Sequence, residues 1–580
     1  MDSTDTEGKQ PILSPTRPPV GSPTGPPPEP EPDGDARTIP LKQELKIQVK
    51  LALPVVATLF TSMLSLSIVL VFLGKFGAAT LAAATLANLL ANISGFSICW
   101  GILSGIDTLS AQAFGAGALP RVGLVAQRGM IISLLTSIPI GCLWIFSGPV
   151  FSLLTPDPDV AAMAIRFLWW RVPGLPVSII YEGLRRYLQA QGQVFAILLA
   201  QLTSLGGTML LCWLLIDVAG IGYLGAAMAV SLNQLVLSLF LVGYIYVKRA
   251  QFRSTWPAPS RAMFRGWCEF LKFGIPGAAM SCLEWWVYEF SNAFVAFIST
   301  EALAAYSVMI TYSSLIYMIP LGFSVAAAVR VGHLLGANAP KNARRASFVN
   351  LGMALCTLIL PFGFLIIVRG DMIVPFSTDP AMIAVAEEAA VIMAFFILFD
   401  GTQCAIGGIL RGLGKQTAGA TVNLLTYYGV AVPLQAMFTF LWNWKNIKGI
   451  WLAALLAAFL TAAIFLVICL RTNWPRSAQA AVVRSRAEQA HVPPPPPLAE
   501  AHPPSLTTPS VRSRDETGPP RGYQAEAAHP PPPGLNAGSP QQDGSQPPAS
   551  TTQPELTGSG VAGDDQRLGD SAVAPPTLTR

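Results

Sequence analysis

A few carboxylates inside long apolar segments have the strongest potential for chemistry. Glu284 and Glu289 lie in Cys-Leu-Glu-Trp-Trp-Val-Tyr-Glu, and Asp400 lies in Leu-Phe-Asp-Gly. An ionisable side chain at the centre of a bilayer costs about 3 kcal/mol or more, so it normally faces a cavity or a partner. Because burial disfavours the ionised form of a carboxyl group, protons compete with other cations for such a site. We therefore predict that these three acids bind a proton or a cation.

Aromatic side chains accompany the acids. They lie on the segment of Glu284 and on the next segment: Trp285, Trp286, Tyr288, Tyr306, Tyr312 and Tyr317. An organic cation between a carboxylate and the face of an aromatic ring gains a charge partner and a cation–π attraction. One site that holds either a proton or a cation, and that opens alternately to each side of a membrane, is an antiporter. The competing interpretation is an aromatic belt at the membrane interface, with acids that only form structural hydrogen bonds.

Three other positions carry charge inside or beside the apolar segments. Asp107 is predicted to accept structural hydrogen bonds or to pair with an arginine near the end of the second segment. Glu182 precedes Arg185 and Arg186 by three and four residues, the spacing of an ion pair on a helix surface. Arg171 falls near mid-membrane by residue count and has no assigned partner. We therefore expect structural roles for Asp107 and Glu182.

The composition describes a membrane protein. Of 580 residues, 52% are hydrophobic and only 12% are charged, and the mean hydropathy is +0.50. A soluble protein has about twice that share of charged residues. The net charge of +5 is modest, and no basic stripe is interleaved with aromatic residues. This composition argues against a nucleic-acid-binding protein.

Sequence motifs for metal binding and catalysis are missing. The eight cysteines have no paired spacing, and three of the four histidines lie in the C-terminal tail. A disulfide framework, a zinc site and a histidine relay are therefore not predicted. The sequence also has no Walker A loop, nucleophile elbow, His-Glu-x-x-His motif or dinucleotide fingerprint. We expect no enzymatic activity and no cofactor, with the proton as the coupling ion.

Twelve hydrophobic stretches are long enough to cross a membrane as helices. They are residues 47–73, 82–110, 121–152, 160–187, 194–217, 221–247, 267–298, 302–333, 345–369, 382–409, 416–441 and 448–470. An even number of spans places both tails on one side, where the loops are rich in Lys and Arg. The positive-inside rule assigns that side to the cytoplasm. We predict a multi-pass protein with cytoplasmic termini, in the plasma membrane rather than an organelle membrane.

Proline-rich tails flank the apolar core. The predicted regions are a disordered N-terminal tail (1–43), a six-helix lobe (44–250), a cytoplasmic linker (251–266), a second six-helix lobe (267–472) and a disordered C-terminal tail (473–580). The N-terminus lacks the apolar stretch of a signal peptide. Proline runs at 493–497 and 530–533 favour the polyproline conformation that polyproline-binding domains recognise.

An internal repeat relates the two lobes at an offset of about 222 residues. Lys50-Leu-Ala-Leu-Pro54 returns as Lys272-Phe-Gly-Ile-Pro276, and Asp157-Pro158 returns as Asp379-Pro380. Copies separated by six spans insert in the same orientation. The sequence therefore predicts an all-α membrane protein with twelve transmembrane helices in two pseudo-symmetric six-helix bundles, and prolines that interrupt several of the helices.

The repeat does not extend to the acids. The positions equivalent to Glu284, Glu289 and Asp400 in the first lobe are Ser62, Ser67 and Ser178. At 1.5 Å per residue from the outer ends, Glu284 and Asp400 come out at similar depths of about 21 and 24 Å, with Glu289 at about 13 Å. We therefore predict that the second lobe carries the proton or cation site.

These segments resemble the multidrug and toxic compound extrusion (MATE) family, most closely its eukaryotic proton-coupled branch. The matching motifs are Cys282–Glu289, Gly322–Gly332 followed by Gly336-Ala337, Pro173–Pro176 with Tyr187–Gly192, and Gly407–Gly412. The resemblance covers nearly all of the core and neither tail. It implies two six-helix lobes and multidrug efflux, in which organic cations and other xenobiotics are exported in exchange for protons.

The resemblance also assigns site residues by position. Glu284 and Glu289 match the glutamates of the family's seventh helix, and Asp400 stands where mammalian members have glutamate. The further acid of mammalian members falls here at Thr311, a departure that bears on substrate range and coupling stoichiometry. The substrate cavity implied for this chain is lined by Trp285, Tyr288, Tyr306, Tyr312 and Thr311.

Two other functions stay open from the sequence. A lipid-linked or glycoside flippase shares the architecture and needs a wider cationic cleft, for which Arg171 is a weak indication. A membrane receptor or scaffold that recruits partners through its proline-rich tails leaves the buried acids without a role. A major-facilitator sugar porter is disfavoured, because the loop from Gly115 to Arg121 lacks that family's Asp-Arg/Gly-Arg-Arg pattern.

Overall fold

The computed structural model describes residues 35, 38–372, 374, 379–442 and 446–489, and these residues form helices and turns without any strand. Within them, ten helices or runs of helices are long and apolar enough to cross a membrane. α11 (Trp267–Ala296) and the pair α6 (Pro158–Trp169) and α7 (Gly174–Gln189) supply the other two predicted spans. The prediction of twelve helical spans is thus confirmed.

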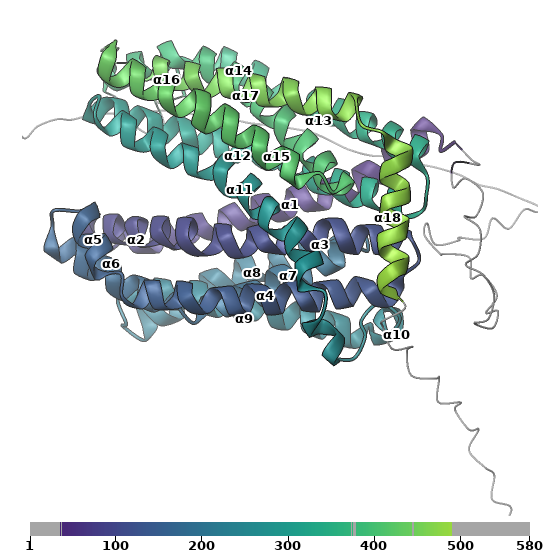
Figure 1. Ribbon diagram of the computed structural model, residues 1–580. Coiled ribbons are helices and arrows are strands. Elements are labelled where there is room, and N and C mark those ends of the chain that lie inside the picture. The colour runs from purple at the N-terminus through teal and green to yellow at the C-terminus, as the bar shows by residue number, and fades with distance from the viewer. Residues whose placement is uncertain (1–34, 36–37, 373, 375–378, 443–445, 490–580) are drawn as a thin grey trace, which may run out of the picture. The chain divides into compact units, whose positions relative to one another are not determined.

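The first lobe contains the helices before the linker (Figure 1). They are α1 (Leu41–Gly74), α2 (Ala78–Ala91), α3 (Ser97–Gly115), α4 (Leu119–Ile145), α5 (Gly148–Leu154), α6, α7, α8 (Val194–Cys212) and α9 (Leu224–Val247). Two predicted spans are broken: Phe146 and Ser147 separate α4 from α5, and residues 170–173 separate α6 from α7. Both breaks precede or contain a proline, which cannot donate a helical hydrogen bond and clashes with the preceding turn.

The second lobe follows a linker that contains α10 (Arg249–Phe252). Its helices are α11, α12 (Thr300–Gly336), α13 (Pro340–Ile367), α14 (Pro380–Leu413), α15 (Gln416–Asn423), α16 (Val432–Ala436) and α17 (Lys448–Leu470). π-helical turns at Leu424–Ala431 and Met437–Leu441 extend the segment of α15 and α16. Pro54, Pro276 and Pro320 lie inside continuous helices. The interruptions expected at these prolines are therefore absent, since a long membrane helix tolerates the loss of one backbone hydrogen bond.

A further helix corrects the predicted start of the C-terminal tail. Residues expected to be disordered from 473 onward form α18 (Trp474–Gln489), which runs across the ends of both lobes (Figure 1). Trp474, Ala478, Ala481 and Ser485 are buried and share one face of this helix. α18 packs against α3 and α4 of the first lobe and against α12 and α13 of the second. The proline runs at 493–497 and 530–533 lie outside the described residues.

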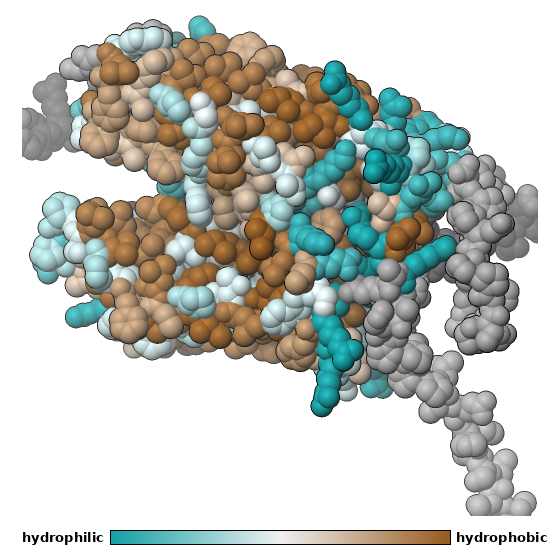
Figure 2. Space-filling view, in the orientation of Figure 1, coloured by the Kyte–Doolittle hydropathy of each residue, from teal (hydrophilic) through white to brown (hydrophobic). Residues whose placement is uncertain are grey.

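The end of the lobes next to α18 is polar. Figure 2 shows hydrophilic residues gathered at this end, hydrophobic residues over the flanks of both lobes, and a hollow between the lobes at the opposite end. On α18, Arg484 donates to the Gln112 side chain (2.9 Å) and lies 5.0 Å from the Phe273 ring centroid. The Arg484 carbonyl accepts a hydrogen bond from Arg121. Burial lowers the pKa of the Arg484 guanidinium from its usual value.

Close contacts between the lobes lie at the same end. A buried ion pair joins Arg330 of α12 to Glu44 of α1, with an N···O distance of 2.7 Å. A Cβ atom added at Gly115 would overlap the carbonyl of His333, and one added at Gly336 would overlap the carbonyl of Gln112. The backbones of α3 and α12 therefore approach too closely for any side chain at these two glycines.

Candidate functional site

The structure brings Glu284 and Asp400 together inside the second lobe. Glu284 on α11 is 7% exposed, and Asp400 on α14 is 4% exposed. The side-chain amide of Gln403 donates to both carboxylates, to Glu284 Oε1 at 2.8 Å and to Asp400 Oδ1 at 3.2 Å. The predicted shared location of the two acids is thus realised through a common hydrogen-bond donor.

Two tyrosines complete the polar contacts of the acids. The Tyr317 hydroxyl donates to Glu284 Oε1 at 2.7 Å. The Tyr288 hydroxyl donates to Asp400 Oδ1 at 3.1 Å. Each carboxylate therefore accepts hydrogen bonds from neutral donors only among the contacts described here, and no arginine or lysine bonds to either.

Helix periodicity explains how these side chains meet. On α11 the buried face includes Met280, Glu284, Val287 and Ser291, which are spaced by three or four residues. On α14, Gln403 follows Asp400 by one turn, so both side chains project on the same face. α14 packs against both α12, which carries Tyr317, and α17. The site is therefore built from three helices of a single lobe.

Gln403 is the site residue that the sequence analysis missed. Its signal was weak: an uncharged polar residue one turn after Asp400 in an apolar helix. Its carbonyl oxygen Oε1 is buried without a hydrogen-bond partner in the described part of the chain, as is the hydroxyl of Tyr427. Tyr427 packs with Val287 and against Tyr288. These two unsatisfied groups can accept hydrogen bonds from a protonated acid, a water molecule or a cation that carries N–H groups.

Glu289 stands apart from the other two acids. It follows Glu284 by five residues, which on a helix is about 7.5 Å along the axis and about 140° around it. Its side chain is half-buried, and none of the hydrogen bonds found among the described residues joins it to Glu284 or Asp400. The geometry therefore groups Glu284 with Asp400 and leaves Glu289 as a separate acid on the same helix.

The predicted cavity residues occupy different environments. Tyr288 is bonded to Asp400, and Tyr312 is half-buried. Trp285 is 46% exposed, and Thr311 is exposed with its hydroxyl donating to the Ser307 carbonyl. Tyr306 is buried in the core, with its ring centroid 5.3 Å from that of Trp451. Of the aromatic residues predicted beside the acids, Tyr288 and Tyr317 are thus hydrogen-bonded to them, Tyr288 to Asp400 and Tyr317 to Glu284.

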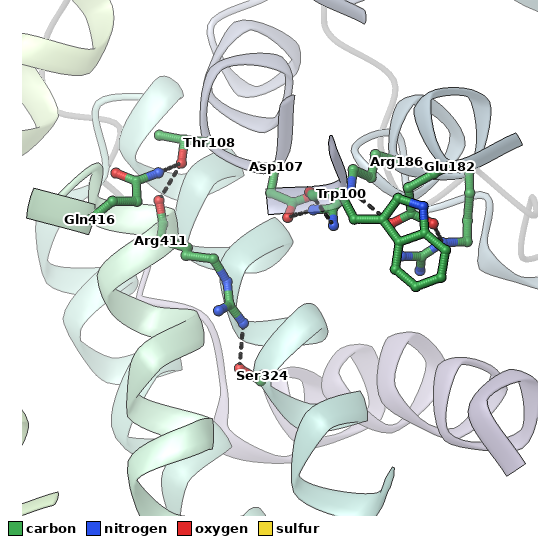
Figure 3. Close-up of polar contacts among 9 residues, drawn as sticks. Trp100, Asp107, Thr108, Glu182, Arg186, Ser324, Arg411 and Gln416 are labelled. Atoms are coloured by element: carbon green, nitrogen blue, oxygen red, sulfur yellow. Dashed lines mark hydrogen bonds and ion pairs between the residues drawn. The ribbon is translucent and has the colours of Figure 1, made fainter. Parts of the chain in front are cut away.

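The equivalent positions in the first lobe have no charge. Ser62 and Ser67 are exposed, and Ser178 is buried with its hydroxyl donating to the Leu175 carbonyl at 2.8 Å. The two acids of that lobe that Figure 3 shows lie elsewhere and are paired with arginines. Glu182 accepts hydrogen bonds from Arg185 and Arg186, which confirms the predicted pairs.

Asp107 joins the same cluster. Arg186 donates to its carboxylate and also to the Trp100 carbonyl at 3.2 Å (Figure 3). Two acids, Asp107 and Glu182, thus face two arginines, so their charges balance within the cluster. Arg171, which had no partner from the sequence, lies at the break between α6 and α7 with its guanidinium 5.2 Å from the Phe96 ring centroid.

A second group in Figure 3 connects the two lobes. The Thr108 hydroxyl on α3 donates to the backbone carbonyl of Arg411 on α14 at 2.6 Å, and Gln416 donates to Thr108 at 2.5 Å. The Arg411 guanidinium donates to the Ser324 hydroxyl at 2.7 Å. Arg411 lies toward the polar end of α14, more than two turns beyond Asp400, so the two contacts of Thr108 close that end of the interface between the lobes, and the Ser324 contact holds Arg411 within the second lobe.

Comparison with known proteins identifies the family. The MatE family model matches residues 54–214 and again residues 276–437, one match in each lobe, which together cover more than half of the chain. The chain belongs to the MatE family. The two MatE matches begin at Pro54 and Pro276, the same pair of prolines that reveals the internal repeat.

Curated relatives and solved structures agree with the MatE assignment. Multidrug and toxin extrusion protein 2 of Mus musculus is 34% identical over 72% of this chain and 72% of its own length. Multidrug and toxin extrusion protein 1 of Homo sapiens is 31% identical over 79% of this chain and 80% of its own. The crystal structure of the eukaryotic MATE transporter AtDTX14 has a TM-score of 0.72 at 29% identity, covering 77% of this chain and 99% of that one. The predicted fold of two six-helix bundles is therefore confirmed.

Proposed function

We propose that this MatE-family protein is a secondary active transporter that exports organic cations and drugs in exchange for protons by alternating access. The observation that carries the proposal is the buried pair of Glu284 and Asp400, bridged by Gln403. Family membership supports it, because the relatives are named as multidrug and toxin extrusion proteins.

The negative charge of Glu284 and Asp400 explains how proton binding is coupled to substrate binding. Two carboxylates that share one neutral donor away from water need a cation to balance their charge. A proton on either acid supplies it, and so does a cationic substrate beside Tyr288, whose ring adds a cation–π attraction. Because the two cations compete, loading a proton from one side releases the substrate there. Glu289, on the next turns of α11, is proposed as a further binding acid along the same route.

The polar end of the molecule indicates which side of the protein faces the cytoplasm. α18 and the contacts between the lobes lie at the end that the positive-inside rule assigns to the cytoplasm. We therefore place both termini in the cytoplasm and the hollow between the lobes on the outer side of the plasma membrane. Opening toward the cytoplasm then requires the contacts around Thr108 and Gly336 to separate.

Neither rival function gains a specific observation. A lipid-linked or glycoside flippase needs a wider cationic cleft, whereas the buried pair is acidic and Arg171 lies against Phe96. A receptor or scaffold needs no buried carboxylates, and the tails that would recruit its partners lie outside the described residues. The acidic pair therefore favours cation transport.

The test uses purified protein in liposomes with an imposed pH gradient. Wild-type protein should exchange a fluorescent or radiolabelled organic cation for protons, and Glu284→Gln should reduce this exchange at least tenfold, because the amide keeps the shape of the side chain but does not gain or lose a proton near neutral pH. Ser62→Ala, at the position of the first lobe that is equivalent to Glu284, is the control and should retain exchange. Proton-driven uptake that persists unchanged in Glu284→Gln would remove this acid from the mechanism.

A further inference from the structure

A basic pocket lies at the start of α13, on the polar end of the second lobe. It has a volume of about 580 Å³ and is lined by Lys341, Arg344, Arg345, Phe348 and Val349. Lys341 and Arg344 are exposed, and Arg345 is half-buried. Among the ion pairs of the described residues, none involves any of these three cations. Three like charges on consecutive turns of one helix repel each other unless an anion occupies the pocket.

The N-terminal segment of the chain already contacts the edge of this pocket. The carboxylate of Asp35 accepts hydrogen bonds from the backbone N–H groups of Lys341 (2.8 Å) and Asn342 (3.1 Å). The backbone N–H of Ile39 donates to the Asn342 side chain at 3.2 Å. An acid at the first turn of a helix also interacts favourably with the helix dipole. Asp35 therefore anchors the N-terminal segment at the first turn of α13.

The sequence before Asp35 carries negative charge, which is opposite to the charge of the pocket. Acids alternate with prolines in the run Pro28-Glu29-Pro30-Glu31-Pro32-Asp33. The run thus offers three carboxylates next to a pocket with three unpaired cations. We propose that residues 28–34 of this chain dock in the basic pocket, as an acidic strap that ties the N-terminal segment to the second lobe.

The spacing of the charges fits this docking. In the polyproline conformation, alternate residues are about 6 Å apart along the segment. Basic residues three or four positions apart on α13 are about 4.5–6 Å apart along the helix axis. Each carboxylate of the run can therefore face its own cation, while the proline rings lie against Phe348 and Val349.

The length of chain between the acidic run and its anchor at Asp35 also fits this docking. An extended chain covers about 3.3 Å per residue, so Asp33 reaches about 7 Å and Glu29 about 20 Å from Asp35. The pocket extends from Lys341 to Val349, about 12 Å along α13. A tether this short gives an effective concentration in the millimolar range, so weak individual ion pairs suffice to occupy the pocket.

The experiment measures cross-linking in the full chain, in liposomes of neutral phosphatidylcholine. The exposed cysteines Cys142, Cys268 and Cys356 are first replaced by serine. Pro32→Cys and Phe348→Cys then place one thiol on the strap and one in the pocket. We expect a disulfide to form under mild oxidation, at a rate that falls about tenfold when salt is raised from about 0.05 to 0.5 M, because the salt screens the charges.

Charge variants decide between docking and random encounter. Neutralising the strap with Glu29→Gln, Glu31→Gln and Asp33→Asn should slow the cross-link about tenfold. The matched control neutralises three acids of the same tail outside the strap, Asp2, Asp5 and Glu7, and should leave the rate unchanged. Exchanging the charges, with lysine in the strap and glutamate at Lys341, Arg344 and Arg345, should restore the rate.

Two results would overturn the proposal. If neutralising the strap leaves the rate unchanged, the tether alone brings the thiols together and no docking occurs. If phosphatidylinositol bisphosphate in the liposomes binds the pocket equally well with and without the acidic strap, and abolishes the cross-link, then the pocket is a site for anionic lipid headgroups instead. Neither result depends on cation transport, so the proposal stands or falls separately from the proposed function.

Discussion

A single methyl group at Gly336 tests the close contact between the lobes. A Cβ atom at this position would overlap the Gln112 carbonyl oxygen and would lie 2.8 Å from the backbone nitrogen of Ala116. Both partners are backbone atoms of the first lobe, so no side-chain rotation can relieve the overlap. Overpacking destabilises a contact by about 1–3 kcal/mol. The better helix propensity of alanine offsets at most about 1 kcal/mol of this destabilisation. We expect Gly336→Ala to weaken the contact by about 1–2 kcal/mol, or about 5- to 30-fold in the opening equilibrium.

The opening is measured by the reactivity of a buried thiol. Thr108→Cys, in a chain without the three exposed cysteines, places a thiol at a position that is fully buried between the lobes. Maleimide should label it about 5- to 30-fold faster in Gly336→Ala, in line with the shifted equilibrium. Gly352→Ala on α13 is the control, because an added Cβ there meets nothing within 4 Å. Equal labelling rates for the two alanine variants would show that the glycine contact does not hold this end closed.

Two further predictions concern α18 and the acidic pair. A chain that ends after Gln489 should keep the wild-type melting temperature in detergent, whereas a chain that ends after Asn473 should melt several degrees lower, since it loses the buried face of α18; equal melting temperatures would contradict the packing of this helix. Asp400→Asn should flatten the pH dependence of the initial rate of cation transport, while Ser178→Ala should keep the wild-type profile and Asp400→Glu should retain transport; the opposite pattern would place the proton site in the first lobe.

The sequence was sufficient to predict the scaffold and part of the site. Spans of about 20 apolar residues have one physical solution in a bilayer, a helix, so their positions were predictable to within a few residues. The recurrence of Pro54 as Pro276 indicated that the two lobes are related by pseudo-symmetry. Residue counts along two helices placed Glu284 and Asp400 at one depth, and the structure joins them through Gln403.

The features that the sequence did not reveal depend on tertiary contacts. Gln403 differs from other polar residues of the apolar helices only by the two carboxylates that it bridges. α18 is rich in charged residues, and its buried face of Trp474, Ala478 and Ala481 is too narrow to stand out from a proline-rich tail. This face is buried because helices of both lobes pack against α18.

The two lobes share one fold, but they differ in the groups that contact their acidic side chains. In the first lobe, Asp107 and Glu182 are each paired with arginine, so adding a proton there must break an ion pair. In the second lobe, Glu284 and Asp400 accept hydrogen bonds from tyrosine and glutamine, which can remain in place when the charge of the pair changes. A duplicated scaffold thus carries one cluster whose charges are fixed and one whose charge can vary. Exchange of a proton for a cation requires the second kind, and this requirement locates the proposed coupling site in the C-terminal lobe.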